Sequence, residues 1–459
     1  MCQEHVVITG RPKRLTRLGC EPGSIVVVLE PAYAGIIPHF RKEEQMSFIG
    51  LDVHKKFING AVIDSPSEHA KRVFTIPTKK ESITRFASSL SPSDSLALES
   101  TTHAFPIANL IRKNSNGANV VVSNPMKTKV INESKNKSDS VDALALANLL
   151  ASGYLPVIWE PDSETGSLRK ITSYAQAIGR DRTAVKNRVH SILHRNLIEY
   201  SGISDLFGKK GRKFLFSLSL PEDEQLQLAE ELETLDFLDR RFVSIKERMA
   251  KVSVKDNYIK RLMTIPGIDY FIAFSLKAAI GNDISRFKSP KKLVGYFGLC
   301  SSVYQSADKR YTGKITKRGR SHARWVLVQA AQAIVKSPSP LRAFFLRIKN
   351  KRGRNKAIVA VAAKLSRIIW NMLTKGEDYF YSPPLRTKEK LAKLRIIATG
   401  EKMKSGPKKG IPSAGGRTAY LKARKNDKTT AKSAECDYVK FIKERFSSRK
   451  SARRTEFLS

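Results

Sequence analysis

The sequence predicts an α/β domain near the N-terminus, then a helical spacer, a mainly α-helical domain and a basic tail. Three observations predict this order. Short apolar segments within residues 47–123 alternate with helical patterns, which is typical of a layered α/β domain. Residues 163–260 have almost wholly helical periodicity. After about residue 383, basic residues far outnumber acidic ones, with Gly, Ser and Thr filling much of the rest.

Each expected element of the α/β domain follows from its apolar spacing. We expect strands at 48–53, 57–63, 72–76, 95–99 and 119–123, and helices at 79–90, 103–113 and 139–151. The first three strands form a meander, and helices then alternate with strands. In the spacer, apolar residues recur at steps of three and four: Leu228, Leu232, Leu235, Leu238, Phe242, Ile245, Met249 and Val252. This heptad seam predicts either a coiled coil or a helix packed in a bundle of its own chain.

These patterns divide the chain into five segments. Residues 1–45 form an extension ahead of Met46, which we expect to lie close to the working start of the first domain. The α/β domain spans 46–155, the helical or coiled-coil spacer 156–260, and the mainly α-helical domain 261–380. The basic tail, 381–459, is expected to be disordered on its own.

The net charge of the chain limits the classes of partner that it can have. Lys and Arg number 83 against 42 Asp and Glu, a formal net charge of +41. So positive a chain requires a polyanion or a membrane surface as partner. No apolar run is expected to cross a bilayer and no secretory signal is recognised, so a membrane protein and a secreted scaffold are excluded. The four cysteines show no CxxC spacing, which predicts reduced thiols in a cytoplasmic protein without zinc.

Four carboxylates form the first candidate site. Asp52 and Glu99 end predicted strands, and Asp139 and Asp142 share one face of a helix start. If the first and fourth strands are neighbours, as in an RNase H-like sheet, the four acids converge and repel one another. Divalent cations remove that repulsion, and oxygen ligands suit Mg²⁺ or Mn²⁺. The alternative is that Asp139 caps the helix, Asp142 meets its dipole, and Asp52 and Glu99 are surface charges.

The segments around these acids resemble DEDD-type insertion-sequence transposases, which are related to the Piv/MooV-like invertases and carry a RuvC-like domain. The motifs are Gly50-Leu51-Asp52-Val53-His54-Lys55, Leu98-Glu99-Ser100-Thr101 and Lys137-Ser138-Asp139-Ser140-Val141-Asp142-Ala143. The family pattern Asp-x-x-Lys is met by Asp52 and Lys55, and we expect Lys55 to contact nucleic acid. In the family all four acids coordinate magnesium. The resemblance therefore implies a catalytic, metal-binding role for Asp52, Glu99, Asp139 and Asp142.

A serine in a basic loop is the second candidate site. Six basic residues follow Ser306 and are expected to contact nucleic acid: Lys309, Arg310, Lys314, Lys317, Arg318 and Arg320. Composition does not single out Ser306, because Ser301 and Ser302 lie close by. The region resembles the C-terminal transposase domain of the same family, whose catalytic serine aligns with Ser306. The resemblance covers about Met46 to Tyr379, with Ala307 where the family has glycine.

The resemblance implies a transposase or site-specific recombinase of a prokaryotic insertion sequence. Ser306 would be the nucleophile, and a bridge RNA encoded by the element would guide the protein to DNA. The family also implies a homodimer that assembles into a tetramer, in which one subunit's serine domain complements another's metal domain. We expect the protein to be cytoplasmic and associated with the nucleoid, with no membrane partner.

Two other functions remain open. The first is a RuvC-like nuclease that hydrolyses branched DNA with water, which leaves Ser306 dispensable. The second is a basic nucleic-acid-binding protein without catalysis. His54, His103 and His190 lack partners at metal-ligand spacing, so we expect them to be structural or solvated.

Overall fold

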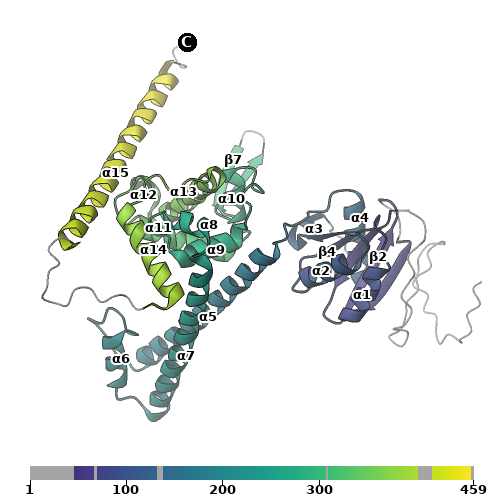
Figure 1. The fold of residues 1–459 in the computed structure, drawn as a ribbon, viewed down its shortest axis with the longest axis horizontal. Helices are drawn as coiled ribbons and strands as arrows, with labels where there is room; N and C mark the ends of the chain where they lie inside the picture. Colours follow the sequence, from purple (N-terminus) through teal and green to yellow (C-terminus); the bar gives the residue numbers. More distant parts are fainter. Residues whose placement is uncertain (1–45, 67–69, 132–137, 307–308, 402–415, 456–459) are drawn as a thin grey trace, which may run out of the picture. The chain divides into compact units, whose positions relative to one another are not determined.

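The computed structural model describes residues 46–66, 70–131, 138–306, 309–401 and 416–455 (Figure 1). The expected extension, 1–45, lies outside the described residues. The chain divides into two compact units after Glu160, and each is described by itself.

A five-stranded sheet with the order β3-β2-β1-β4-β5 forms the centre of the first unit. Its strands are β1 (Phe48–Val53), β2 (Phe57–Ile63), β3 (Arg72–Pro77), β4 (Ser95–Glu99) and β5 (Asn119–Ser123). Strand β2 is antiparallel to both β1 and β3, whereas β4 is parallel to both β1 and β5. The helices are α1 (Lys80–Ser88), α2 (Ala104–Asn114), α3 (Pro125–Ile131) and α4 (Asp139–Ala151). The mixed α/β prediction is therefore confirmed, and the first and fourth strands are neighbours as expected.

The two faces of this sheet are packed differently. Large apolar side chains of alternate strand positions, such as Ile49 and Leu51, share one buried cluster with Phe86 of α1 and Ile111 of α2. Helix α4 packs across β1, β2 and β4 and shares a second, smaller cluster that contains Ala97, Leu146 and Leu155. Successive side chains of a strand point to opposite faces of the sheet. Helices α1 and α2 therefore cover one face, and α4 covers the other.

Small residues let α4 approach β1 very closely. A Cβ atom added to Gly50 would lie 1.9 Å from the main-chain oxygen of Ala143 and 2.7 Å from the nitrogen of Ala147. Only glycine therefore fits at this position. Gly50 lies two residues before Asp52, so the same contact fixes the first turn of α4 relative to the end of β1.

The first unit extends slightly past the expected boundary at residue 155. The N–H of Ile158 donates to the carbonyl of Val122 at 2.8 Å, and Glu160 pairs with Arg112 of α2 at 2.7 Å. The segment after α4 therefore returns to the edge of the sheet beside β5.

Two long antiparallel helices, α5 (Ser163–Arg195) and α7 (Glu222–Ser253), open the second unit, with α6 (Lys209–Phe216) between them (Figure 1). Ion pairs join them along their length, including Arg188 with Glu231 and Arg195 with Glu224. The leucines at the start of α7 pack against the end of α5, where Leu228 and Val189 share one buried cluster. The heptad seam is therefore satisfied within the chain, which is the second of the two expected alternatives.

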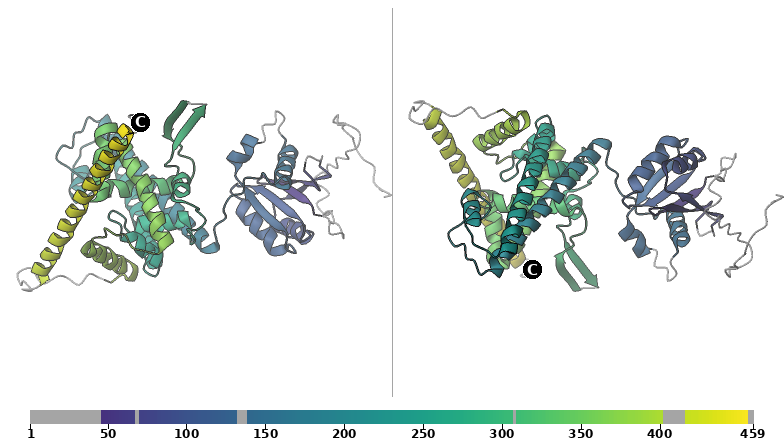
Figure 2. Two further views of the ribbon diagram at one scale, coloured as in Figure 1. Left: turned by 90° about the horizontal axis from the view of Figure 1, so that it is seen from above. Right: turned by 90° about the horizontal axis from the view of Figure 1, so that it is seen from below.

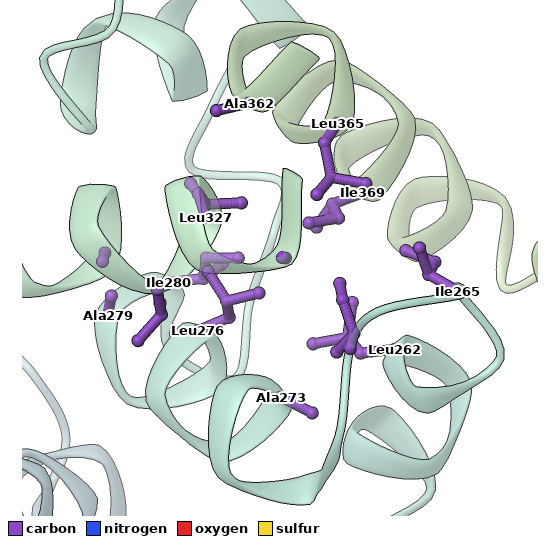
Figure 3. Close-up of a cluster of buried hydrophobic side chains, with 14 of the residues drawn as sticks. Leu262, Ile265, Ala273, Leu276, Ala279, Ile280, Leu327, Ala362, Leu365 and Ile369 are labelled. Atoms are coloured by element: carbon purple, nitrogen blue, oxygen red, sulfur yellow. The ribbon is translucent and has the colours of Figure 1, made fainter. Parts of the chain in front are cut away.

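The remaining helices pack around one large apolar core (Figure 3). They are α8 (Asn257–Met263), α9 (Tyr270–Ile280), α10 (Pro290–Tyr296), α11 (Ser321–Ile334), α12 (Pro340–Arg352), α13 (Arg354–Lys375) and α14 (Pro384–Thr399). Figure 3 shows side chains of α8, α9, α11 and α13 converging, among them Leu262, Leu276, Leu327 and Leu365. A mainly α-helical C-terminal region is thus confirmed.

Helix α13 corrects the expectation that no segment is long and apolar enough to cross a bilayer. Its 22 residues meet that test by length and composition. However, Val361, Ala362, Leu365 and Ile369 of this helix are all fully buried in the core. Packing inside the unit accounts for its apolar length without a membrane.

The expected disorder of the tail is wrong for the part that the structure describes. Leu394 and Ala398 of α14 are buried in the core, and the ammonium group of Lys390 donates to the carbonyls of Ile265 and Ile268 at 2.9 and 3.0 Å. Residues Gly416–Thr455 form one helix, α15, which packs on α12 and in which Ala434 is buried. The composition was basic enough to suggest disorder, but these few apolar residues are enough to dock helices.

We expect Gly50→Ala to destabilise the first unit by about 1–3 kcal/mol, because the new methyl group meets backbone atoms that cannot rotate away. Amide hydrogen exchange of β1 and α4 in the full-length chain would measure the loss.

Gly166→Ala in α5 is the matched control. A Cβ at Gly166 meets nothing within 4 Å, so this exchange should be neutral or stabilise its helix by up to about 1 kcal/mol. Equal protection of α4 in the Gly50→Ala protein and the wild type would contradict the close approach.

Candidate active site

Asp52 and Glu99 lie side by side at the ends of two parallel strands. In the register of β1 and β4, Leu51 pairs with Leu98, so the next residues along the strands are Asp52 and Glu99. Both side chains leave the same face of the sheet, which is the face that α4 covers. Asp52 has a side chain only 19% exposed. Both strands therefore deliver a carboxylate to one point.

The first turn of α4 supplies the other two acids. Ser138 caps the helix, because its hydroxyl oxygen accepts a hydrogen bond from the N–H of Val141 at 3.3 Å. Asp139 is therefore not the N-cap, contrary to the alternative that the sequence left open. It is free to turn towards the sheet, and Asp142 lies on the same face of α4.

Asp139 is held by polar side chains of the sheet and of the turn after β1. The side-chain amide of Asn59 donates to Asp139 Oδ2 at 3.1 Å, and Thr75 in turn donates to Asn59 at 2.7 Å. His54 Nε2 lies 2.8 Å from Asp52 Oδ2 and 3.4 Å from Asp139 Oδ1. Ligand atoms of Asp52, His54 and Asp139 all lie within 4.8 Å of one another, close enough to share one metal ion.

The charges of all four acids act on one another, so the acids form one electrostatic cluster. Burial raises the pKa of Asp52, the charges of Asp139 and Asp142 raise it further, and the hydrogen bond from His54 opposes both. Burial also raises the pKa of Glu99, with further contributions from Asp52 and Asp142. Among the described residues neither Glu99 nor Asp142 forms a salt bridge. The cluster thus holds more negative charge than its surroundings balance, and its oxygen donors fit Mg²⁺ or Mn²⁺.

His54 lies within the candidate site, where sequence reasoning did not place it. We expected it to be structural or solvated, yet its imidazole lies between two of the acids. The hydrogen bond to Asp52 raises the pKa of His54, and the charges of Asp52 and Asp139 add to this effect. The signal in the sequence was its place two residues after Asp52, where the strand ends. Lys55, the next residue, is exposed.

Ser306 is the last residue of a β-hairpin strand rather than part of a loop. Strands β6 (Ser301–Ser306) and β7 (Lys309–Ile315) are antiparallel, and Ser306 pairs with Lys309. The hairpin projects from the helices of the second unit (Figure 2). Ser306 is exposed, as are the predicted nucleic-acid contacts Lys309, Lys314, Lys317, Arg318 and Arg320. The side chain of Arg310 lies outside the described part of the chain.

The base of this hairpin is fastened to its unit by specific contacts. The guanidinium group of Arg324 donates to the carbonyls of Phe297 and Lys317 at 3.0 Å each. Arg320 donates to the hydroxyl of Tyr296 at 3.2 Å. Lys317 has a positive φ of 54°, an unusual backbone conformation for a residue other than glycine. These contacts fix where the hairpin leaves the core, while its tip stays exposed.

The structure therefore brings four of the five predicted catalytic residues together. Asp52, Glu99, Asp139 and Asp142 form the cluster in the first unit, and Ser306 lies with its basic neighbours in the second. The chain thus carries two chemically distinct sites, a carboxylate cluster and an exposed serine in basic surroundings.

Comparison with known proteins points to one family for both sites. The transposase model DEDD_Tnp_IS110 matches residues 49–197, and the model described as the transposase IS116/IS110/IS902 family matches residues 259–346. The first match contains all four acids and the second contains the serine hairpin.

Individual relatives agree with these matches. The transposase for insertion sequence element IS1111A of Coxiella burnetii is 25% identical over 250 residues, which are 53% of this chain and 68% of that protein. The transposase for insertion sequence element IS1328 of Yersinia enterocolitica is 24% identical over 351 residues, 72% of this chain and 98% of that protein. The chain belongs to the DEDD-type insertion-sequence transposase family.

Proposed function

We propose that this chain cuts and rejoins the DNA of an insertion sequence, with Ser306 as the nucleophile and the four acids as ligands of divalent cations. The family itself implies a DNA-cutting and DNA-rejoining enzyme that has DNA as its partner. The observation that carries the proposal is the convergence of Asp52, Glu99, Asp139 and Asp142, in which burial and like charges raise the pKa values of Asp52 and Glu99.

The carboxylates suit a hard cation better than any other group nearby. Asp52 and Glu99 are held by the sheet, and Asp139 and Asp142 are held by the capped helix, so the ligands are positioned before a cation binds. Mg²⁺ or Mn²⁺ is the expected ion. When bound, it supplies Lewis-acid stabilisation of negative charge on phosphate oxygens. The strand order β3-β2-β1-β4-β5 supports an RNase H-like, RuvC-like identity for this unit.

The serine reaction conserves phosphate esters. The Oγ atom of Ser306 attacks the phosphorus of a phosphodiester, and the bond from phosphorus to one deoxyribose oxygen breaks as the bond to Oγ forms. The serine proton goes to a base or to solvent, and the leaving oxygen gains a proton. Attack of a second deoxyribose hydroxyl on the phosphoserine reverses these steps, so no ATP is consumed. The exposed Lys309, which pairs with Ser306 across the hairpin, places positive charge beside the phosphate.

Guidance by a bridge RNA, a homodimer that assembles into a tetramer, and a location in the cytoplasm at the nucleoid complete the proposal. The net charge of +41 supports simultaneous binding of RNA and DNA. In such an assembly Ser306 of one subunit would meet the carboxylates of another. Lys55 would contact nucleic acid beside the metal ligands.

One observation favours a second candidate function. The carboxylate cluster is complete within the first unit, so a RuvC-like nuclease that activates water would not need Ser306. Hydrolysis leaves no protein joined to DNA, whereas the serine mechanism requires such an intermediate. A binding protein without catalysis would form no adduct and cut no DNA.

Ser306→Ala should abolish the covalent protein–DNA adduct and all strand exchange, because no other group replaces the attacking oxygen. Full-length protein would be incubated with Mg²⁺, the element's junction DNA and the RNA transcribed beside the gene, then resolved on denaturing gels. Omission of the RNA should also prevent adduct formation.

Ser301→Ala and Ser302→Ala are the matched controls, since both serines lie on the same strand, and both variants should keep the adduct. Cleavage without any adduct in the wild type would favour the water-dependent nuclease.

Asp52→Asn and Glu99→Gln should each lower the rate of adduct formation by about 100-fold or more, because several kcal/mol of charge stabilisation is lost. They should also remove the rise in melting temperature that Mg²⁺ gives the wild type. Glu81→Gln, an exposed acid in the first turn of α1, should change neither quantity. Unchanged activity of the wild type in excess chelator would refute the metal site.

Binding of Mg²⁺ should weaken as pH falls. A carboxylate must lose its proton to bind a cation, and the pKa values of Asp52 and Glu99 are raised. The pKa of His54 is raised as well, so its proton competes for the same oxygens. All three groups bind protons more tightly in the folded chain, so stability without metal falls as pH rises through these pKa values.

Titration of the Mg²⁺-dependent rise in melting temperature between about pH 5 and pH 8 would measure this competition. His54→Gln should make the dependence on pH shallower. Stronger binding at the acid end would contradict the assignment of these ligands.

A further inference from the structure

Two tyrosines stand opposite each other on the serine hairpin. Tyr304 of β6 pairs with Tyr311 of β7 in the hairpin register. Their exposed fractions are 67% and 65%. Among the described residues no hydrogen bond involves either hydroxyl group. A single exposed aromatic side chain needs no explanation, but here two of them are adjacent on one exposed hairpin.

The tyrosines lie on the same face of the hairpin as Ser306. Side chains alternate between the faces of a strand, so Tyr304 and Ser306, two residues apart, point to one side. Gly313 of β7 confirms this face, because a Cβ added to it would lie 2.4 Å from Ser302 Oγ and 3.6 Å from a ring carbon of Tyr304. Glycine at 313 therefore leaves room for the Ser302 hydroxyl group beside the Tyr304 ring.

Distance along the strand relates the rings to the serine. Two residues of a strand span about 7 Å. This is roughly twice the 3.4 Å by which successive nucleotides of one strand advance along the axis of duplex DNA. A phosphate at Ser306 would therefore have its first or second neighbouring base over the two rings.

The charge of the hairpin selects the partner. Its described residues, 301–306 and 309–315, contain basic side chains and no acidic one. Exposed aromatic rings between positive charges are the features that bind unstacked nucleic-acid strands, because every base has a face that stacks on a ring. An acidic peptide would be attracted by the lysines but would make no use of two flat, adjacent rings.

Stabilisation of the hairpin itself is the competing explanation. Cross-strand aromatic pairs contribute roughly 0.2–1 kcal/mol to a sheet, and this two-stranded sheet is exposed on both faces. Valine keeps the strand preference of the position but removes the ring. Valine and phenylalanine variants therefore separate strand stability from stacking.

We propose that Tyr304 and Tyr311 form a stacking platform for one or two unpaired bases of the DNA strand next to the scissile phosphate. The platform sets that phosphate against the Oγ atom of Ser306. This inference rests on the proposed function, since it takes Ser306 as the nucleophile. Tyr304 and Tyr311 are positioning residues, because they touch bases beside the reacting atoms.

Photocrosslinking tests the platform without requiring cleavage. Full-length Ser306→Ala protein would be bound to its RNA and to junction DNA in which 5-iodouracil replaces one base at a time near the cut. Irradiation and mass spectrometry would identify the crosslinked residue. We expect crosslinks to Tyr304 or Tyr311 only from bases within about two nucleotides of the cut. Crosslinks at other residues, or to labelled RNA in place of DNA, would overturn the proposal.

The second measurement is the rate of adduct formation by protein that keeps Ser306. Tyr304→Val and Tyr311→Val should each slow adduct formation about 5-fold to 100-fold, the range that loss of one stacked base implies. Tyr304→Phe and Tyr311→Phe should stay within about 2-fold of the wild type, because the ring face remains. Val303→Thr, an exposed residue of the opposite face, is the matched control and should have no effect.

These variants distinguish base stacking from a role of the tyrosine hydroxyl groups, from loss of the hairpin and from an error in the proposed nucleophile. If the phenylalanine variants lose as much as the valine variants, the hydroxyl groups act instead and stacking is refuted. If hydrogen exchange shows that a valine variant has lost its hairpin, Tyr304→Trp decides, since it keeps a ring and should keep the crosslink. If Ser306→Ala still forms the adduct, the proposed nucleophile is wrong, whatever the crosslinks show.

Discussion

The contact between Gly50 and the backbone of α4 is the constraint on which the first site depends. Helix α4 lies so close to β1 that a single methyl group at Gly50 would overlap the carbonyl of Ala143. Because Asp52 follows Gly50 by two residues and Asp139 opens the same helix, this approach determines how far apart the acids from the sheet and the acids from the helix lie. The small side chains of Ala97, Ala143 and Ala147 serve the same purpose. The same small residues therefore determine both how closely α4 packs on the sheet and where the carboxylates lie.

Charge explains why the cluster is poorly satisfied without a cation. Four acids share one corner of the first unit, where Asn59 donates a hydrogen bond to Asp139 and His54 is the one salt-bridge partner among the described residues. A proton on His54 compensates Asp52 and Asp139 but leaves Glu99 and Asp142 without a cationic partner among the described residues. A folded chain normally avoids such an arrangement, because partly buried like charges cost stability. The proposed cation would relieve this repulsion.

Much of the first unit followed from the sequence. Short apolar runs predicted the bounds of β1, β2, β4 and β5, and helical spacing predicted those of α4. Convergence of the acids also followed once β1 and β4 were taken as neighbours. His54 did not, since its role depends on the turn that brings the imidazole back over Asp52. The heptad seam of α7 did not show which helix it packs against. In the tail, the many basic residues gave no sign that Leu394 and Ala398 would be buried. Periodicity identifies faces, but only the folded chain shows what covers them.

The β6–β7 hairpin has a consequence for when the enzyme is reactive. A two-stranded ribbon that is packed on neither face opens at little energetic cost, so its tip has no rigid frame of its own. In the proposed reaction, the Ser306 hydroxyl group would then be aligned mainly by the nucleic acid lying on the hairpin. Without bound nucleic acid, the proposed nucleophile would not be aligned for attack. Accurate cutting would then depend on assembly with the nucleic acid and not on a preformed pocket.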